Sequence, residues 1–314
     1  MTTPVRRRAG KLLYRLTHRR PRWHGYDLVP HLAFERDADA RWARALYRGR
    51  EVARLTPYAE LLAARPREIV VVGAGPSLVA QRLERLRERA AILTNGALAL
   101  VERAGLEPFA VVVEDESFVD ACPRLVAGIP AGTAVVVTPP VLRAVCELEP
   151  ALLGRWRVHL AEILHKPIGA PRPSPDELER APFVRAAGDA QFSLDPQRGL
   201  GSCGTVAFVA AQLAVACRPA ALGFAGVDLA GFDRPRFHEL AGRRAPSHLE
   251  RRLPSILRGF GLLAAICAEL GIALRNHSPA SRLGDAGIVY DDWLDAAGRA
   301  ADPCASGPDS GTLP

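Results

Sequence analysis

The sequence predicts an α/β fold: a doubly wound, mostly parallel, Rossmann-like sheet of about seven strands with a basic N-terminal extension. Two observations predict it. Short runs rich in Val, Ile, Leu and Ala recur from residue 67 onward, and they are apolar at consecutive positions, as in strands buried on both faces. Helical stretches separate most of these runs, and such alternation favours an open sheet with crossover helices. The 314 residues suffice for one large domain of this kind with appendages.

Seven runs are the expected strands, because β-branched and aliphatic residues dominate them. They are 68–72, 90–94, 109–113, 133–138, 157–163, 221–226 and 272–276. The expected helices between and after them are 79–89, 97–104, 141–147, 205–216 and 253–270.

The composition divides the chain into three parts. Residues 1–66 form a basic, partly helical extension, with a helix expected over 38–62. Residues 67–299 form the α/β domain, and within it 167–198 are rich in Pro and charge, which indicates an excursion from the sheet or a mobile lid. Residues 300–314 are rich in Gly, Pro, Ser and Asp and are expected to be a disordered tail.

The charge of the chain indicates an acidic partner. The net charge is +7 and the pI is about 9.4. Much of the excess lies between Arg6 and Arg22, where leucines are interspersed. This arm is either a solvated basic segment or a peripheral anchor on an anionic membrane. Because the basic residues gather in one arm without a nucleic-acid motif, no nucleic-acid partner is expected.

Cysteine usage and hydropathy favour a cytoplasmic protein. The six cysteines include no CxxC pair, and Cys203, Cys217 and Cys267 lie in apolar helical stretches, which suits buried thiols in a reducing compartment. No N-terminal stretch has the apolar core of a signal peptide, and the longest apolar run, 203–217, is too short to span a bilayer. The protein is expected to be soluble or peripheral.

In doubly wound sheets the ligand binds at the carboxyl ends of the strands, so the residues after each strand are the candidates. The first strand ends in GAGPS, which includes Gly73, Gly75, Pro76 and Ser77. Glycines allow a phosphate to approach the backbone amides at the start of a helix. The alternative is a purely structural tight turn, because the stretch is neither GxGxxG nor a P-loop.

Polar residues follow the next two strands as well. Asn95 suits a base, a ribose or a sugar, or it caps the following helix. Glu114, Asp115 and Glu116 suit Mg²⁺ or sugar hydroxyls, or they are the solvated start of a helix.

A second glycine turn and two later strand ends complete the candidate cleft. The turn GLGSCG contains Ser202, Cys203 and Gly204 and precedes an expected helix. The backbone amides at a helix N-terminus can bind an anion. The strand after that helix ends at Gly226 and Asp228. The last strand ends in NHSPAS, which includes the polar residues Asn276, His277, Ser278 and Ser281 at the cleft edge or at a helix cap.

The order of these motifs resembles the bacterial sialyltransferases of glycosyltransferase family 42. It is also similar to the motility-associated flagellin glycosyltransferases and to 6-hydroxymethylpterin diphosphokinase-like proteins. The motifs that carry the resemblance are GAGPSL, TNGA, GSCGT, GFAGVDLAGFD and NHSPASRL, spread over residues 68–283.

The resemblance implies a cytidine nucleotide site. Phosphate and ribose would lie against Gly73, Gly75, Pro76 and Ser77, and Asn95 would contact the donor. Donor sugar or phosphate would be held by Ser202, Cys203 and Gly204. The nucleotide would be bound by Gly226 and Asp228, and its cytidine side would be closed by Pro279 and Ser281.

The resemblance also implies a histidine as general base in the stretch after the Gly-Val-Asp strand end. Both His238 and His248 lie in that window, and His248 has the better spacing. A histidine near its ordinary pKa of about 6.5 suits this task. The family's phosphate-binding tyrosines are absent, since no Tyr lies between Tyr58 and Tyr290; the candidates to replace them are His159, His165 and Lys166.

The resemblance thus implies an inverting glycosyltransferase that uses a CMP-activated acidic 2-keto sugar, sialic acid-like or Kdo, and a surface-glycan or lipid-linked acceptor. No cofactor or metal is required for this reaction. Two alternatives stay open: a pyrophosphokinase-like phosphoryl transferase with Mg²⁺ on Asp115 and Asp228, and a non-catalytic nucleotide-binding module.

Overall fold

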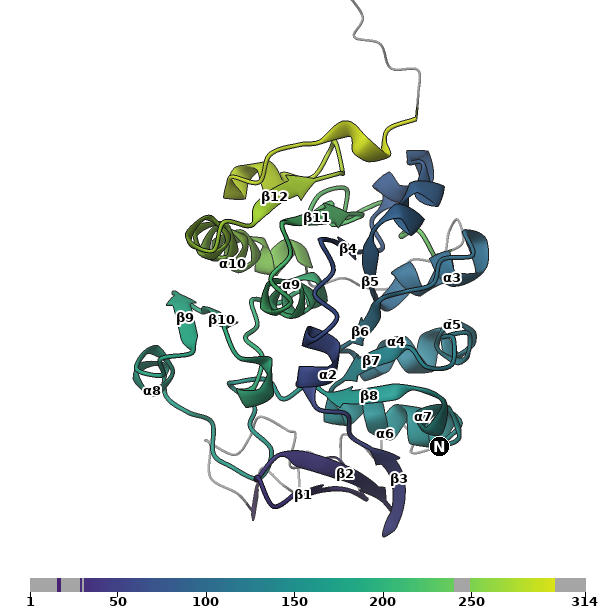
Figure 1. Ribbon diagram of the computed structural model, residues 1–314, viewed down its shortest axis with the longest axis vertical. Coiled ribbons are helices and arrows are strands. Elements are labelled where there is room, and N and C mark those ends of the chain that lie inside the picture. Colours follow the sequence, from purple (N-terminus) through teal and green to yellow (C-terminus); the bar gives the residue numbers. More distant parts are fainter. Residues whose placement is uncertain (1–15, 18–28, 30, 240–248, 297–314) are drawn as a thin grey trace, which may run out of the picture.

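Seven parallel strands form the central sheet of the protein (Figure 1). The computed structural model describes residues 16–17, 29, 31–239 and 249–296. In spatial order the strands are β12 (Ala273–Asn276), β11 (Ala221–Ala225), β4 (Glu68–Val72), β5 (Ala90–Thr94), β6 (Ala110–Val113), β7 (Ala134–Val137) and β8 (Arg157–Leu160). Each coincides with one of the seven expected strands, so the predicted doubly wound parallel sheet is confirmed.

Alternate residues of each strand pack into two separate apolar cores. In β4, Ile69 and Val71 join one core, while Val70 and Val72 join the other. Both faces are buried because these strands carry no polar face. Figure 1 shows helices on each side of the sheet.

The helices divide between the two faces. One core contains residues of α9 (Val206–Ala216) and α10 (Leu249–Glu269). The other contains residues of α3 (Ala99–Arg103), α4 (Glu116–Ala121), α5 (Pro123–Ala127), α6 (Pro139–Leu148) and α7 (Leu152–Arg155). Apart from Gln212, helix α9 is apolar around its whole circumference, which suits its central, almost fully buried position.

The strand order reverses beside β4. From β4 the chain builds the sheet outward through β5, β6, β7 and β8, and it then returns to add β11 and β12 on the other side of β4. The carboxyl ends of β4 and β11 therefore flank the switch point, where doubly wound sheets bind their ligands.

The expected helix over 38–62 is wrong. The chain forms an antiparallel sheet of β1 (Leu32–Arg36), β2 (Trp42–Tyr47) and β3 (Arg50–Arg54), followed by the short helix α2 (Tyr58–Leu62). The deciding feature is a tight turn: Arg48 has φ +52° and Gly49 has φ +76°. Two successive positive φ values match the twist of a two-residue hairpin, and an Arg-Gly pair is a weak sequence signal for it.

The expected helix over 79–89 is also wrong. Two 3₁₀ helices, η2 (Pro76–Ala80) and η3 (Leu83–Glu88), replace it. Between them Gln81 bridges to Asp295, and the amide of Arg82 donates to the carbonyl of Leu294 at 2.8 Å. These tertiary hydrogen bonds use the backbone groups that a continuous helix would need.

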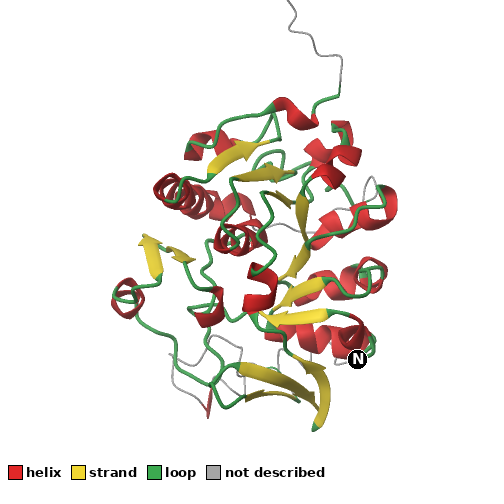
Figure 2. Cartoon of the chain, viewed as in Figure 1, coloured by secondary structure: helices red, strands yellow, loops and turns green. Residues whose placement is uncertain are grey.

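Residues 167–198 leave the central sheet, as expected, but they are not merely a loop (Figure 2). They contain α8 (Pro175–Glu179), a hairpin of β9 (Val184–Ala187) and β10 (Ala190–Ser193), and η5 (Pro196–Arg198). An ion pair between Asp189 and Arg258, with N–O 2.5 Å, ties the hairpin to α10.

Two further expectations fall outside the described residues: the basic arm, apart from residues 16–17, and the tail 300–314. Among the described helices, none has the length and apolar character needed to cross a bilayer.

Candidate functional site

The turn after β4 and the end of β11 are joined by hydrogen bonds. The amide of Gly73 donates to the carbonyl of Ala225, and the amide of Gly75 donates to that of Gly226, each at 2.8 Å. We call residues 73–77 together with 225–228 the β4–β11 joint. It lies at the switch point and brings together several residues that the sequence predicts for the site.

Side chains reinforce this joint. Asp228 accepts hydrogen bonds from the amide of Ser77 at 2.9 Å and from its hydroxyl at 2.6 Å. The hydroxyl of Ser278 lies 3.0 Å from that of Ser77 and accepts from the amide of Gly226 at 2.9 Å. Asp228 and Ser278 are both buried, so these hydrogen bonds satisfy groups that lie away from water.

The segment after β12 supports the joint from behind. Ser281 donates its hydroxyl to the carbonyl of Val227 at 2.6 Å and also caps the short helix that follows, as one interpretation of the sequence expected. Asn276 holds the backbone of Ser278 with hydrogen bonds of 3.0 and 3.1 Å. Pro279 is exposed beside this network.

The joint gives the glycines of the first turn a structural reason. A Cβ on Gly73 would overlap the carbonyl oxygen of Gly226, and one on Gly75 would lie 2.5 Å from the Asp228 carboxyl carbon. The amides of Gly73, Gly75 and Ser77 already donate within the protein. Helix η2 has only five residues, so it does not supply the expected helix N-terminus for a phosphate. The structure favours the tight-turn interpretation.

The second glycine turn is held by one buried side chain. Gln212 of α9 accepts hydrogen bonds from the amides of Ser193 and Gly201 at 2.8 and 2.7 Å, and it donates to the carbonyls of Gly201 and Phe208. A Cβ on Gly201 would overlap the carbonyl of Gln191. The sequence marks Gln212 only as a polar break in an apolar run, so its positioning role was missed.

Within this turn, Ser202 and Gly204 are half-buried, whereas Cys203 is only 3% exposed. Cys203 packs against α10, where a Cβ on Gly259 would lie 2.8 Å from its sulfur. Burial raises the pKa of its thiol well above the ordinary value. Cys203 therefore has a packing role, while its two neighbours remain available to a ligand.

Three charged residues near this second turn interact through their charges. Glu114 follows β6, Lys166 follows β8, and Arg252 lies in the first turns of α10 with its Cδ 2.6 Å from where a Cβ of Gly204 would be. We call Glu114, Lys166 and Arg252 the charged cluster. It lies at the carboxyl edge of the sheet, where sequence reasoning weighed Glu114 and Lys166 but found no signal for Arg252.

The charged cluster has perturbed protonation. Burial raises the pKa of Glu114, although Lys166 and Arg252 act to lower it. Burial lowers the pKa of Lys166, and the charge of Glu114 opposes that shift. Each of these two residues thus favours the charged form of the other in a site that disfavours both charges.

The other two carboxylates of the Glu114–Glu116 stretch have structural partners. Asp115 caps α4 by accepting from the amide of Ser117 at 2.9 Å, as one interpretation expected. Glu116 forms an ion pair of 2.5 Å with the buried guanidinium of Arg143 in α6. Asp228 is occupied by Ser77, so the carboxylate pair of the phosphoryl-transfer alternative is engaged elsewhere. Among the described residues no group of three His, Cys, Asp or Glu is arranged to hold a metal.

Asn95 occupies a different part of the same edge. It has φ +43°, it begins a short 3₁₀ helix rather than capping it, and its Oδ1 is buried without a hydrogen-bond partner among the described residues. The expected N-cap role for Asn95 is therefore wrong. A Cβ on the next residue, Gly96, would overlap the imidazole of His238, so this histidine lies against the end of β5.

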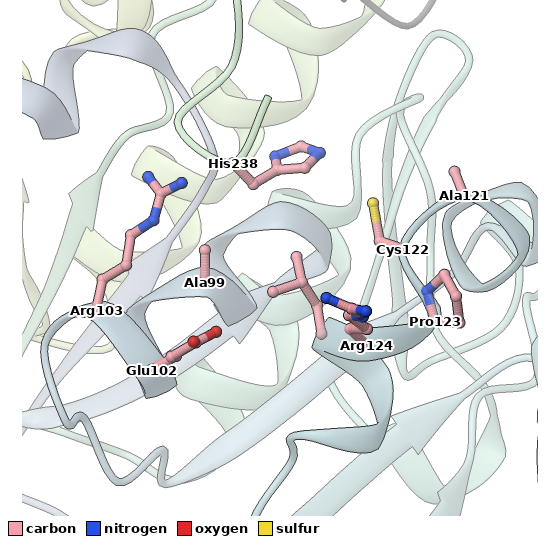
Figure 3. A pocket seen from close by; sticks show the side chains of 9 residues that line it. Ala99, Glu102, Arg103, Ala121, Cys122, Pro123, Arg124 and His238 are labelled. Carbon is pink, nitrogen blue, oxygen red and sulfur yellow. The ribbon is translucent and has the colours of Figure 1, made fainter. Parts of the chain in front are cut away.

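A pocket of about 330 Å³ begins at His238 (Figure 3). It lies between α3 and the junction of α4 with α5, beside the carboxyl edge rather than at the charged cluster. Its lining residues are Ala99, Glu102, Arg103, Ala121, Cys122, Pro123, Arg124, Leu125 and His238.

The remaining histidines have different positions. His277 is fully buried, with Nδ1 3.1 Å from the carbonyl of Asp291, and burial lowers its pKa. His159 is fully buried within β8 and stacks on Tyr58. Both have packing roles. Of the two remaining candidates for the phosphate, His165 and Lys166, both are half-buried, and only Lys166 belongs to the charged cluster. The predicted base, His248, lies outside the described residues.

The chain was compared with protein-family models, curated proteins and solved structures. No family model matches the chain, and no curated protein matches it. Among solved structures, the MAf glycosyltransferase from Magnetospirillum magneticum AMB-1 is similar over 68% of this chain and 32% of that chain, with 14% identity and a TM-score of 0.43. This chain thus spans about a third of that protein's length, and a likeness of this size carries no conclusion about function.

Proposed function

We propose that the protein is a glycosyltransferase that moves an acidic 2-keto sugar, sialic acid-like or Kdo, from a CMP-activated donor to a surface-glycan or lipid-linked acceptor. The observation that carries the proposal is the charged cluster of Glu114, Lys166 and Arg252. It lies beside the turn at Ser202 and Gly204, on the edge of the sheet where such folds bind nucleotides.

The chemistry explains why this cluster suits the reaction. Transfer breaks the bond between the sugar C2 and the phosphate oxygen, and CMP leaves with additional negative charge. Lys166 and Arg252 supply positive charge at that place, as a metal ion or tyrosines do elsewhere. Glu114 favours the protonated form of Lys166, because its charge opposes the effect of burial on the lysine pKa.

The other half of the reaction needs a base for the proton of the acceptor hydroxyl. We propose His248 for this role, on the motif resemblance and because it directly precedes α10, which carries Arg252. In this account the β4–β11 joint forms a rigid floor for the nucleotide. The proposed donor contacts are then the accessible edges of the joint together with Ser202, Gly204, Asn95 and Pro279.

The setting of the reaction is part of the same proposal. A CMP-sugar enzyme of this kind would work in the cytoplasm on a glycan or glycolipid precursor. The basic arm around Arg6–Arg22 would hold it at an anionic inner leaflet. We expect no metal requirement, because the cluster itself supplies the cationic groups.

Substitution of Lys166 tests the function. We expect Lys166→Met to lower kcat/KM for CMP-N-acetylneuraminate or CMP-Kdo about 100-fold or more, because removal of one preorganised charge stabiliser costs that much. Lys166→Arg keeps the charge and should retain much of the rate. Glu114→Gln should move the alkaline limb of the pH–rate profile to lower pH, since Lys166 then loses its proton more easily. The proposal would be contradicted if the wild-type protein cleaves neither donor. Equal rates in the wild type and Lys166→Met would also contradict it.

A further inference from the structure

The pocket at His238 is a second place where the protein offers cationic groups to a ligand. Its lining shares no residue with the charged cluster or with the β4–β11 joint. Its volume of about 330 Å³ lies at the lower end of the range for small-molecule sites. A ligand there would be a small molecule separate from the nucleotide donor proposed above.

The lining of this pocket combines apolar and charged side chains. Ala99, Ala121 and Leu125 supply apolar surface, while Arg103, Arg124 and Glu102 supply charge. Figure 3 shows the helix with Glu102 and Arg103 facing the turn with Cys122, Pro123 and Arg124, and the His238 ring lies above the space between them. Such a site suits a ligand with an apolar body and a charged end.

The two arginines are in different states. The guanidinium of Arg103 donates to the carbonyl of Phe237 at 2.7 Å and covers the ring of Phe237. Arg124 is exposed, and within the described part of the chain its guanidinium has no hydrogen bond or ion pair. An exposed Arg that forms no ion pair with the described residues, in the lining of a concave site, pairs well with a carboxylate or a phosphate.

His238 lines the pocket with a ring that is fixed in place. Burial lowers its pKa, so the ring is neutral at pH 7. Its Nδ1 is buried against Gly96 without a hydrogen-bond partner in the described chain. The ring itself packs edge-on against Phe118, with centroids 6.0 Å apart, so it is held in place.

We propose that this pocket binds a small organic anion, with its carboxylate or phosphate on Arg124 and its apolar part between α3 and the α4–α5 junction. The site is independent of the CMP-sugar reaction, so it stands or falls separately.

Cys122 gives the pocket a built-in reporter. It is half-buried in the lining, whereas Cys146, Cys203, Cys217 and Cys267 are buried. Iodoacetate and iodoacetamide both alkylate a thiolate by displacing iodide, and they differ in that only iodoacetate is an anion. The ratio of their rates at Cys122 therefore reports anion preference at the pocket, and the raised pKa of the Cys122 thiol cancels in the ratio.

The experiment measures both rates at one pH by mass spectrometry. It uses a Cys304→Ser background, because Cys304 is the sixth cysteine of the chain and lies outside the described residues. We expect the iodoacetate-to-iodoacetamide ratio to fall about three- to five-fold in Arg124→Gln, which matches a partly exposed ion pair, and to be retained in Arg124→Lys. Glu102→Gln removes the one carboxylate among the described lining residues, and it should raise the ratio. Thermal unfolding of all three variants should match the wild type, because neither side chain has a structural partner among the described residues.

Protection from alkylation then identifies the anion. Benzoate should protect Cys122 and the isosteric neutral benzamide should not, if the ligand is a carboxylate; protection by phenyl phosphate would indicate a phosphate. A ratio that is unchanged by Arg124→Gln, no protection by either anion, or no labelling of Cys122 by either reagent would overturn the proposal.

Discussion

The buried imidazole of His159 has a clear physical role in the protein. It is 0% exposed within β8 and stacks on Tyr58, with ring centroids 5.4 Å apart. Burial, helped by the charge of Arg157, lowers its pKa to about 4 from the ordinary 6.5. His159 therefore belongs to the core, and the sequence-based candidacy of this residue as a phosphate ligand is not supported.

The lowered pKa predicts how stability depends on pH. Between pH 6.5 and 4 the unfolded chain binds a proton at His159 and the folded protein does not, so the contribution of this residue is complete above pH 6.5 and declines as the pH falls. The total loss is roughly 3 kcal/mol, at about 1.4 kcal/mol per pH unit. Urea unfolding should show a weaker pH dependence in His159→Leu than in the wild type. The exposed His31, changed to Gln, is the control, and an unaltered slope in His159→Leu would contradict the assignment.

At the scale of elements, the β4–β11 joint couples two strands that are far apart in sequence. Gly75 has φ −65°, which any residue adopts, so its lack of a side chain is a matter of space alone. A methyl group there would lie 2.5 Å from the carboxylate of Asp228 and 2.7 Å from the carbonyl of Gly226.

Gly75→Ala therefore tests the joint. We expect it to lower the free energy of unfolding by about 2–3 kcal/mol through overpacking. Gly154→Ala in α7 is the matched control, because no described atom outside its own helix backbone and chain neighbours lies within 4 Å of the position of the added methyl group. This variant should be neutral or slightly stabilising. Urea denaturation measures both, and equal stability of the two variants would show that the joint is not tightly packed.

The elements that the sequence predicted well are those whose pattern is continuous. All seven strands of the central sheet follow from apolar runs such as 68–72 and 134–137, because burial on both faces leaves one consistent signal. The strands β1–β3 were missed because the Arg48–Gly49 turn is not a strong hairpin signal. The helix expected over 79–89 was wrong because hydrogen bonds to Leu294 and Asp295 override local propensity.

The site was predicted in part. Sequence reasoning found the strand ends, and the structure brings Gly73, Gly75, Ser77, Gly226 and Asp228 together. It could not foresee that these residues bond to one another, since Ser77 and its partner Asp228 are 151 residues apart in the chain. Nor could it find Gln212 or Arg252, because a lone polar residue in a helix carries no pattern.

At the scale of the whole molecule, the reversal of strand order gathers the chemistry on one edge of the sheet. The charged cluster, the second glycine turn and the β4–β11 joint all lie at the carboxyl ends of the strands, although they come from residues 73 to 252. This arrangement is what connects the fold with nucleotide binding in our account.

The most direct test of that account is calorimetric titration of the wild-type protein and Lys166→Met with CMP, CDP, ATP and GTP, each with and without Mg²⁺. We predict that the wild type binds CMP selectively and without metal, and that Lys166→Met binds it at least several-fold more weakly. Preference for ATP with Mg²⁺ would contradict the account in favour of phosphoryl transfer, and binding of no nucleotide would contradict it in favour of a scaffold without a nucleotide site.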